Sequence, residues 1–304
     1  MGEVSMATVG KVGIIRFSAL GDIASALPVM RACREEPLII TSPLGESLLR
    51  DEFDDILVLQ NKRLGTVIGL VRALRKRRLE VITDLQSNDR SKIICRFSAT
   101  DYVNSNGIDQ QQQTTRILHD IAMRSGCFQS LDMAPEPRER SYIVLNAGSS
   151  EKWISKRLPV EKWIEISRLL DERFGLEFVL TGSADEREYV QSLARHLPVS
   201  CRVVAGKTSL PELKGILREA FLTVSTDSGP MHISAVMKTP TMGLFGATNW
   251  IRSAPFGPWS IALYDRRYFS DGTPPQQSQQ QPGPYYDNID IEQGLTQLQT
   301  YLDR

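Results

Sequence analysis

The sequence has no long apolar run and no clustered cysteines. Its 304 residues nowhere approach the roughly 18 consecutive apolar residues of a membrane-spanning helix. Residues 1–17 (MGEVSMATVGKVGIIRF) lack the long apolar core of a secretory signal peptide, so we expect a cytoplasmic protein. The cysteines stand far apart without a CxxC pair, which argues against a zinc site or a disulfide framework: Cys33, Cys95, Cys127 and Cys201.

An excess of charge of either sign is also missing. The chain has 36 Lys and Arg and 36 Asp and Glu residues, which removes the usual argument for nonspecific nucleic-acid binding, and we expect no nucleic-acid partner. Residues 72–78 (RALRKRR) nevertheless hold five cations in seven positions. Such a run is attracted to an acidic surface such as phosphorylated lipid, which would place the protein at the cytoplasmic face of the inner membrane. A solvated helix end is the alternative interpretation.

Two series of alternating strand and helix patterns run along the chain, as is typical of doubly wound α/β folds. The first series predicts strands at 12–17, 38–41 and 81–85 and helices at 23–33 and 64–77. The second predicts strands at 142–146, 177–180, 201–204, 220–224 and 241–245 and helices at 160–174, 185–196 and 211–219. Two similar halves imply a cleft between them.

The domain boundary is predicted where Met133–Pro137 (MAPEP) interrupts the pattern. We therefore expect an N-terminal Rossmann-like domain at 1–135 and a C-terminal one at 136–284. Residues 270–284 (SDGTPPQQSQQQPGP) have the composition of a loop or a disordered segment. Apolar residues at helical spacing then predict a closing helix within 285–304.

The most informative segment is STDSGPMHISA, which follows a buried apolar strand and opens a helix. Asp227 and Ser228 are good N-cap residues, and Gly229 lets the backbone approach a ligand closely. The amides of such a turn lie at the positive end of the helix dipole, where a phosphate binds readily. An ordinary capped helix is the alternative, but His232, one turn further, can reach the same anion.

A second turn of this kind, RFSALGDIASALP, follows the first strand and contains a single carboxylate, Asp22. Asp22 could be a plain N-cap, or a carboxylate at the ligand-binding edge of the sheet that accepts a proton from a hydroxyl. In the second half, the cations at 156–157, Gly182, Thr208 and the turn at 227–232 are of types that suit a diphosphate. No GxGxxG follows the first strand, which argues against a dinucleotide-dependent oxidoreductase.

Six motifs occur in order between about residues 11 and 258: RFSALGDIASALP, DLQSNDRS, NAGSSEKWISKRLPVEKW, AGKTSLPEL, STDSGPMHISA and LFGATN. Together they resemble the ADP-heptose:lipopolysaccharide heptosyltransferases, glycosyltransferase family 9. The resemblance implies a GT-B fold, in which the first domain binds the acceptor and the second binds the nucleotide sugar. It further implies inverting, metal-independent transfer of heptose from ADP-heptose to the lipopolysaccharide inner core, without a cofactor.

The resemblance also implies roles for single residues. Asp22 matches the general base, and Arg90 and Arg116 fall where basic side chains meet the acceptor. Lys156 matches the lysine that neutralises the donor diphosphate, and Glu186 a position that reaches the ribose. The expected donor-binding residues are Lys156, Gly182, Glu186, Thr208, Asp227, Ser228, Gly229 and His232.

Other functions remain open at this point. A GT-B enzyme could use another nucleotide sugar or another saccharide acceptor, which the short first domain favours. A nucleotide-sugar-binding protein without transfer activity would not need the carboxylate of Asp22. A sugar-nucleotide epimerase would need further acid and base groups that the motifs do not supply.

Overall fold

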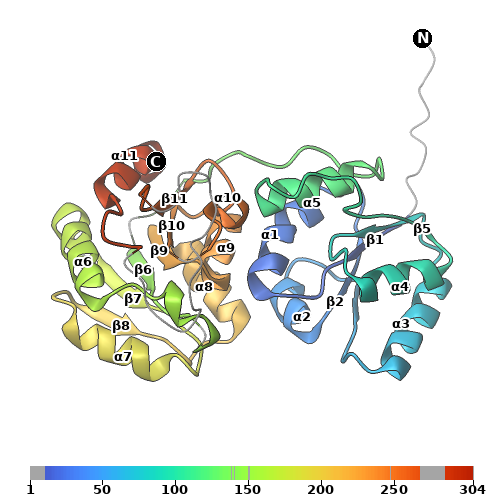
Figure 1. The fold of residues 1–304 in the computed structure, drawn as a ribbon, viewed down its shortest axis with the longest axis horizontal. Coiled ribbons are helices and arrows are strands. Elements are labelled where there is room, and N and C mark those ends of the chain that lie inside the picture. Colours follow the sequence, from blue (N-terminus) through green and yellow to red (C-terminus); the bar gives the residue numbers. More distant parts are fainter. Residues whose placement is uncertain are drawn as a thin grey trace, which may run out of the picture. The chain divides into compact units, whose positions relative to one another are not determined.

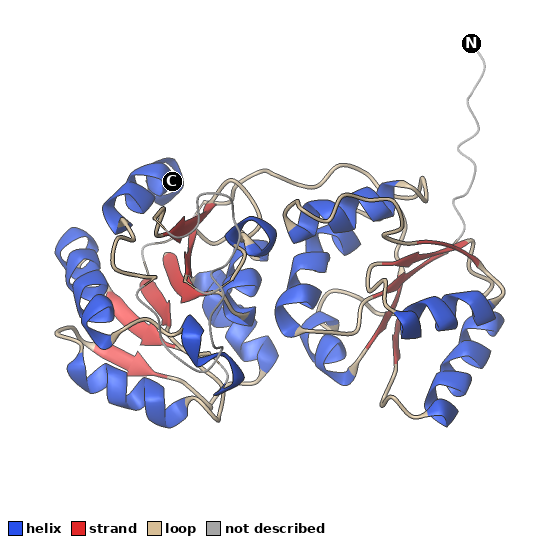
Figure 2. Ribbon diagram, viewed as in Figure 1, coloured by secondary structure: helices blue, strands red, loops and turns tan. Residues whose placement is uncertain are grey.

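The structure is a computed structural model that describes residues 11–137, 139, 141–149, 151–246, 248–267 and 285–303. The chain divides into two compact units, Met1–Asp132 and Met133–Arg304. Each unit is a parallel sheet with helices on both faces (Figures 1 and 2). Residues 270–284, predicted to form a loop or a disordered segment, lie outside the described residues.

Unit 1 contains a five-stranded parallel sheet in the order β3-β2-β1-β4-β5. Helices α1, α2 and α5 cover one face and α3 and α4 the other (Figure 1). The elements are β1 Val12–Ile15, α1 Leu20–Arg31, β2 Leu38–Thr41, α2 Pro43–Leu49, β3 Ile56–Val58, α3 Leu64–Lys76, β4 Val81–Asp84, α4 Asp89–Ser98, β5 Asp101–Val103 and α5 Thr114–Met123.

Unit 2 contains a six-stranded parallel sheet in the order β11-β10-β9-β6-β7-β8. Its elements are β6 Tyr142–Asn146, the 3₁₀ helix η1 Glu151–Lys156, α6 Val160–Phe174, β7 Glu177–Leu180, α7 Arg187–His196, β8 Cys201–Val203, α8 Leu210–Glu219, β9 Leu222–Thr226, α9 Gly229–Val236, β10 Thr241–Phe245, α10 Trp250–Ser253, β11 Ser260–Tyr264 and α11 Ile291–Leu302. Strands β1, β9 and β10 are buried along their whole length, as in parallel sheets covered on two faces.

The predicted strands and helices are largely present, and the differences have local causes. Helix α1 begins at Leu20 rather than at residue 23, because the side chain of Asp22 accepts the Ala19 N–H from the third helical position. Strand β9 begins two residues later than predicted, since Ala220 and Phe221 are buried ahead of it and read like strand residues. An apolar pattern reports burial, not strand pairing.

The short elements escaped the sequence patterns. The three residues of β5 (DYV) are exposed or half-buried and form no apolar run, and the apolar run of β3 (ILV) is only three residues long. Strand β5 is an edge strand, as is β11 in unit 2, and such strands are only partly covered. No helix in the described part of the chain is both long and apolar enough to cross a membrane.

Candidate functional site

The carboxylate of Asp22 lies in the first turn of α1, directly after the carboxyl end of β1. Its Oδ2 accepts the Ala19 N–H at 2.9 Å, and its Oδ1 lies 2.9 Å from Nη2 of Arg16. The Asp22 side chain is 47% exposed, whereas that of Arg16 is only 9% exposed. The buried guanidinium of Arg16 therefore contacts the carboxylate of Asp22 from the protein interior, and the exposed part of this carboxylate stays accessible to a ligand.

The turn after β4 supports the turn that carries Asp22. The side-chain oxygen of Gln86 accepts the N–H groups of Phe17 at 2.8 Å and Ser18 at 3.2 Å. The guanidinium of Arg16 also donates to the carbonyl of Leu85. These bonds join two loops at the same end of the sheet, because Arg16 and Phe17 each contact a residue 69 positions further along the chain.

Asp84 is a second carboxylate at this edge, fully buried at the end of β4. It accepts the Ser87 N–H at 2.9 Å and the Ser91 hydroxyl at 2.8 Å. Burial raises the pKa of Asp84, although these hydrogen bonds and the charge of Arg16 oppose the rise. Its bonds shape the turn into α4, so its function is structural. The DLQSNDRS motif contains it, but nothing in the motif marks it as buried.

The two arginines expected at the acceptor side occupy the first turns of helices in unit 1. Arg90 is the second residue of α4 and is half-buried, and Arg116 is the third residue of α5 and is exposed. The structure places neither in a described contact with Asp22. Their acceptor role stays a prediction.

The turn between β9 and α9 is the centre of the candidate site in unit 2. Asp227 is buried there, and its Oδ2 lies 3.1 Å from Nζ of Lys156, which also donates to the Asp227 carbonyl at 3.1 Å. Nε2 of His232 lies 3.8 Å from Oδ1 of the same carboxylate. Burial by itself raises the pKa of Asp227, but the interaction with His232 and the charge of Lys156 outweigh it and lower the pKa to about 2.

The N-terminus of α9 has no side-chain cap. Ser228 is the N-cap residue, but its hydroxyl does not accept a hydrogen bond from the helix amides. It accepts one from Nδ2 of Asn146 at 2.8 Å instead. The amides that open α9 therefore keep the capacity to bind an anion at the positive end of the helix dipole, beside Lys156.

Asn146, which the sequence analysis did not single out, connects three strands beneath this turn. Its Nδ2 also donates to Ser225 Oγ at 3.0 Å, and its Oδ1 accepts from the Thr181 hydroxyl at 3.0 Å. These side chains come from the carboxyl ends of β6, β7 and β9 and are buried. An asparagine that ends a buried apolar strand is the only signal for this role in the sequence.

Lys156 reaches the site from the last position of η1. Its ammonium lies 5.0 Å from the ring centroid of Trp153, a contact of cation–π type, and its side chain is 18% exposed. Arg157 points elsewhere: it donates to the Ser149 carbonyl at 2.7 Å and lies 4.3 Å from the ring centroid of Tyr189. The two adjacent cations therefore have different partners: Lys156 contacts Asp227, and Arg157 contacts Ser149 and Tyr189.

Glu186 and Gly182 meet at the turns after β6 and β7. Oε2 of Glu186 accepts the Ser183 N–H at 2.7 Å. A Cβ atom at Gly148 would lie 2.6 Å from the Glu186 carboxyl carbon, and one at Gly182 would lie 3.4 Å from Oε2. Gly148 therefore leaves the space that this carboxylate occupies, whereas a Cβ atom at Gly182 would make only an ordinary contact with it.

Thr208 lies after the turn that follows β8 and is half-buried. The N–H of Gly206 donates to the carbonyl of Gly182 at 2.9 Å, which ties this turn to the one after β7. Ser209, the next residue, caps α8 through Glu212. The structure thus brings the predicted donor residues to one edge of the unit 2 sheet: Lys156, Gly182, Glu186, Thr208, Asp227, Ser228, Gly229 and His232.

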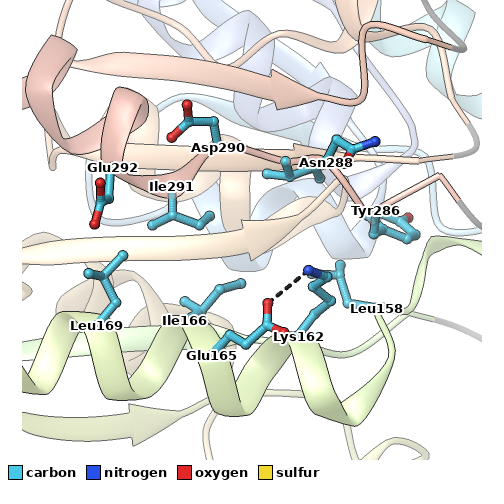
Figure 3. Close-up of a pocket in the computed structure, with 11 residues that line it drawn as sticks. Leu158, Lys162, Glu165, Ile166, Leu169, Tyr286, Asn288, Asp290, Ile291 and Glu292 are labelled. Atoms are coloured by element: carbon cyan, nitrogen blue, oxygen red, sulfur yellow. Dashed lines mark hydrogen bonds and ion pairs between the residues drawn. The ribbon is translucent and has the colours of Figure 1, made fainter.

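A separate cavity of about 370 Å³ lies between α6 and the chain that leads into α11 (Figure 3). Leu158, Ile166 and Ile291 supply apolar walls, and Lys162 pairs with Glu165 at its side. The hydroxyl of Tyr286 donates to the Ser155 carbonyl at 3.3 Å, next to Lys156. None of the predicted site residues lines this cavity. The C-terminal segment nevertheless contacts η1 through the Tyr286–Ser155 hydrogen bond.

Comparison with known proteins identifies the family. The sequence profile of glycosyltransferase family 9 (heptosyltransferase) matches residues 43–270, about three quarters of the chain. The chain belongs to glycosyltransferase family 9. The match contains all the predicted donor residues and begins after Asp22. It confirms the predicted enzyme class, a glycosyltransferase of the heptosyltransferase family.

Individual relatives agree with this assignment. Lipopolysaccharide heptosyltransferase 3 of Escherichia coli (strain K12) is 37% identical over 118 residues, which span 38% of this chain and 33% of that protein. Lipopolysaccharide core heptosyltransferase OpsX of Haemophilus influenzae is 21% identical over 285 residues, which span 80% of this chain and 81% of that protein. The matched part of this chain thus spans about a third of the first relative and most of the second.

Solved structures establish the fold. The family 9 glycosyltransferase from Veillonella parvula superimposes with a TM-score of 0.75 at 18% identity and covers 96% of this chain and 97% of that one. E. coli heptosyltransferase WaaC with ADP superimposes with a TM-score of 0.67 at 17% identity, over 83% of this chain and 92% of that one. The predicted GT-B fold of two Rossmann-like domains is therefore confirmed.

Proposed function

We propose that this protein is an inverting, metal-independent heptosyltransferase that moves heptose from ADP-heptose to the inner core of lipopolysaccharide. The observation that carries the proposal is the arrangement of Lys156 and His232 around the uncapped N-terminus of α9. Two cationic or proton-donating side chains and a helix N-terminus form a binding site for a diphosphate.

The donor diphosphate would bind to the amides of Ser228 and Gly229, to Lys156 and to His232. Negative charge grows on the diphosphate as its bond to the sugar breaks, and donors that are already in place stabilise this charge without a metal ion. The described residues include no group of three or more His, Cys, Asp or Glu side chains that could hold a metal ion. Family membership and the ADP in the WaaC structure support ADP as the nucleotide.

Asp22 would act as the general base. Its exposed carboxylate would take the proton from an acceptor hydroxyl as that oxygen attacks the anomeric carbon and ADP departs from the opposite side, which inverts the configuration. Arg16 would hold the carboxylate in place during this step. The role of Asp22 follows from the family resemblance and from its position after the carboxyl end of β1, and that of Arg16 from its ion pair with Asp22.

The remaining residues would bind the two substrates. Glu186 would contact the ribose and Thr208 the adenine, beside the turn that contains Gly182. Arg90 and Arg116 would meet a phosphorylated saccharide acceptor. Lipopolysaccharide as the acceptor is supported by the names of the relatives, and a cytoplasmic protein in contact with the inner membrane fits such an acceptor.

Calorimetric titration with ADP, UDP and GDP in the presence of EDTA tests the proposal. We expect selective binding of ADP that EDTA does not weaken. A preference for UDP or GDP would contradict the heptose assignment and would instead favour a family member with another nucleotide sugar. Absence of binding to all three would favour a relative without transfer activity.

A further inference from the structure

Large apolar side chains are exposed together on two neighbouring helices of unit 1. Leu64 and Ile68 on α3 are 75% and 42% exposed, and Ile93 and Phe97 on α4 are 50% and 54% exposed. These four make up half of the large hydrophobic residues that are exposed in the described part of the chain; the others are Leu44, Tyr102, Met123 and Met133. Contiguous apolar surface of this kind marks an interaction site.

The four side chains lie on two neighbouring helices, two on one side of each helix. The helices pack side by side (Figure 1). Residues seven apart share a helix side, so Ile68 lies on the same side of α3 as Arg75, and Nε of Arg75 donates to the Phe97 carbonyl at 2.8 Å. Ile93 and Phe97, four residues apart, share a side of α4. We call this surface, formed by Leu64, Ile68, Ile93 and Phe97, the α3–α4 face.

Cations surround the α3–α4 face. Residues 62–96 contain ten Lys and Arg and three Asp and Glu residues, although the whole chain has no net charge. One of the three acids, Asp84, is fully buried. Among the basic residues Arg77 pairs with Asp55 at 3.0 Å. The last turns of the two helices also carry the exposed Arg75, Lys76 and Arg96, and Arg72 is exposed one turn earlier on α3.

The exposed apolar side chains and the cations around them together indicate the class of partner. Apolar side chains that enter the acyl boundary, with long cations around them that reach phosphates, are the chemistry by which helices bind an anionic bilayer. A second copy of the same face would bring two sets of like charges together, which opposes self-association. The charge therefore favours a lipid surface over a second copy of this chain.

We propose that the α3–α4 face docks the protein on an anionic lipid bilayer. Leu64, Ile68, Ile93 and Phe97 enter the interfacial region, and the exposed cations of α3 and α4 contact lipid phosphates. The inference deepens the proposed function and rests on it in one respect: a lipid-linked saccharide acceptor would be presented at such a surface. Vesicle binding itself needs neither donor nor acceptor.

Flotation of the full chain with lipid vesicles tests the proposal. We expect the protein to float with vesicles that contain phosphatidylglycerol, to float much less with phosphatidylcholine alone, and to be released by high salt. The double variant Ile93→Ser/Phe97→Ser should lower partitioning about tenfold or more, because two apolar side chains no longer enter the interface. Met123→Ser, on α5 and 45% exposed, is the control and should float like the unchanged protein.

A second pair of variants separates the charge from the apolar contribution. Arg72→Gln/Lys76→Gln should weaken binding to the anionic vesicles, whereas Arg168→Gln/Arg195→Gln, which removes two exposed cations from unit 2, should not. Circular dichroism shows whether each variant is folded. The proposal would be overturned if all variants floated to the same extent, or if flotation did not depend on the charge of the lipid.

Two further outcomes identify other partners. A dimer in solution that Ile93→Ser/Phe97→Ser dissociates would make the α3–α4 face an interface between copies and overturn lipid docking. Absence of vesicle binding would overturn it as well and leave an acidic protein as the remaining partner class. Because ADP titration is a separate measurement, a failed donor assignment and a failed docking surface are distinguishable.

Discussion

Nζ of Lys156 lies 3.1 Å from Oδ2 of Asp227 and 3.1 Å from the carbonyl oxygen of the same residue. The carboxylate is buried, and the lysine is mostly covered. The pair holds a cation beside the amides that open α9, so the positive charge is in place before any anion binds. The acid therefore acts through the lysine, which it positions at the proposed diphosphate site.

Replacing Lys156 by alanine should weaken ADP binding by about tenfold to a hundredfold, because a charge-assisted hydrogen bond to the diphosphate is lost. Isothermal titration calorimetry measures the change. Lys162→Ala is the control, since that ammonium pairs with Glu165 on α6 and should have no effect on ADP. An unchanged affinity in Lys156→Ala would show that this lysine does not contact the donor.

Asp227 should contribute to the pH dependence of stability. Its pKa in the folded chain is about 2 against an ordinary value of 3.8, so its stabilisation is fully present well above pH 4 and is lost as the pH falls toward 2. The full contribution corresponds to about 2 kcal/mol, of which about 1 kcal/mol is lost by about pH 3. Urea unfolding of the protein and of Asp227→Asn at neutral pH and at about pH 3 measures this difference. Equal losses of stability in the two proteins would contradict it.

Asp22→Asn should abolish transfer while ADP affinity stays unchanged, because a general base acts in the chemical step. We expect a loss of about 10²-fold to 10⁴-fold in kcat. Asp89→Asn is a matched control, since Asp89 also lies in the first turn of a unit 1 helix and is exposed. If Asp22→Asn lost ADP binding and turnover to the same extent, the carboxylate would have a structural role instead.

Gly148→Ala should displace the carboxylate of Glu186, because the added Cβ would lie 2.6 Å from its Cδ. We expect weaker ADP binding together with a loss of stability of about 1–3 kcal/mol, the usual cost of overpacking. Gly215→Ala on α8 meets nothing within 4 Å and should stabilise the protein by about 0.5–1 kcal/mol. Titration with ADP and thermal unfolding of both variants provide the comparison, and an unaltered Gly148→Ala protein would show that Glu186 moves freely.

The long buried elements could be predicted from the sequence, because their signals are local. The strands at Leu38–Thr41, Tyr142–Asn146 and Thr241–Phe245 and the helix at Val160–Phe174 have the predicted bounds. Each is a continuous or periodic apolar run between polar turns, and such a run must be buried wherever the rest of the chain lies. The residue types of the two candidate ligand-binding turns were also present in the local sequence.

No local sequence pattern indicated which side chains contact one another. Lys156 and Asp227 are 71 positions apart, Asn146 and Ser228 are 82 apart, and Phe17 and Gln86 are 69 apart. These pairs form because parallel strands bring the loops at their carboxyl ends to a common edge, where residues distant in sequence come within hydrogen-bonding distance. The sequence by itself determined which residues could bind a diphosphate and which runs had to be buried. Only the tertiary structure decided that Lys156 faces Asp227, that Ser228 leaves α9 uncapped, and that Arg16 supports Asp22, because each depends on strand order in a sheet.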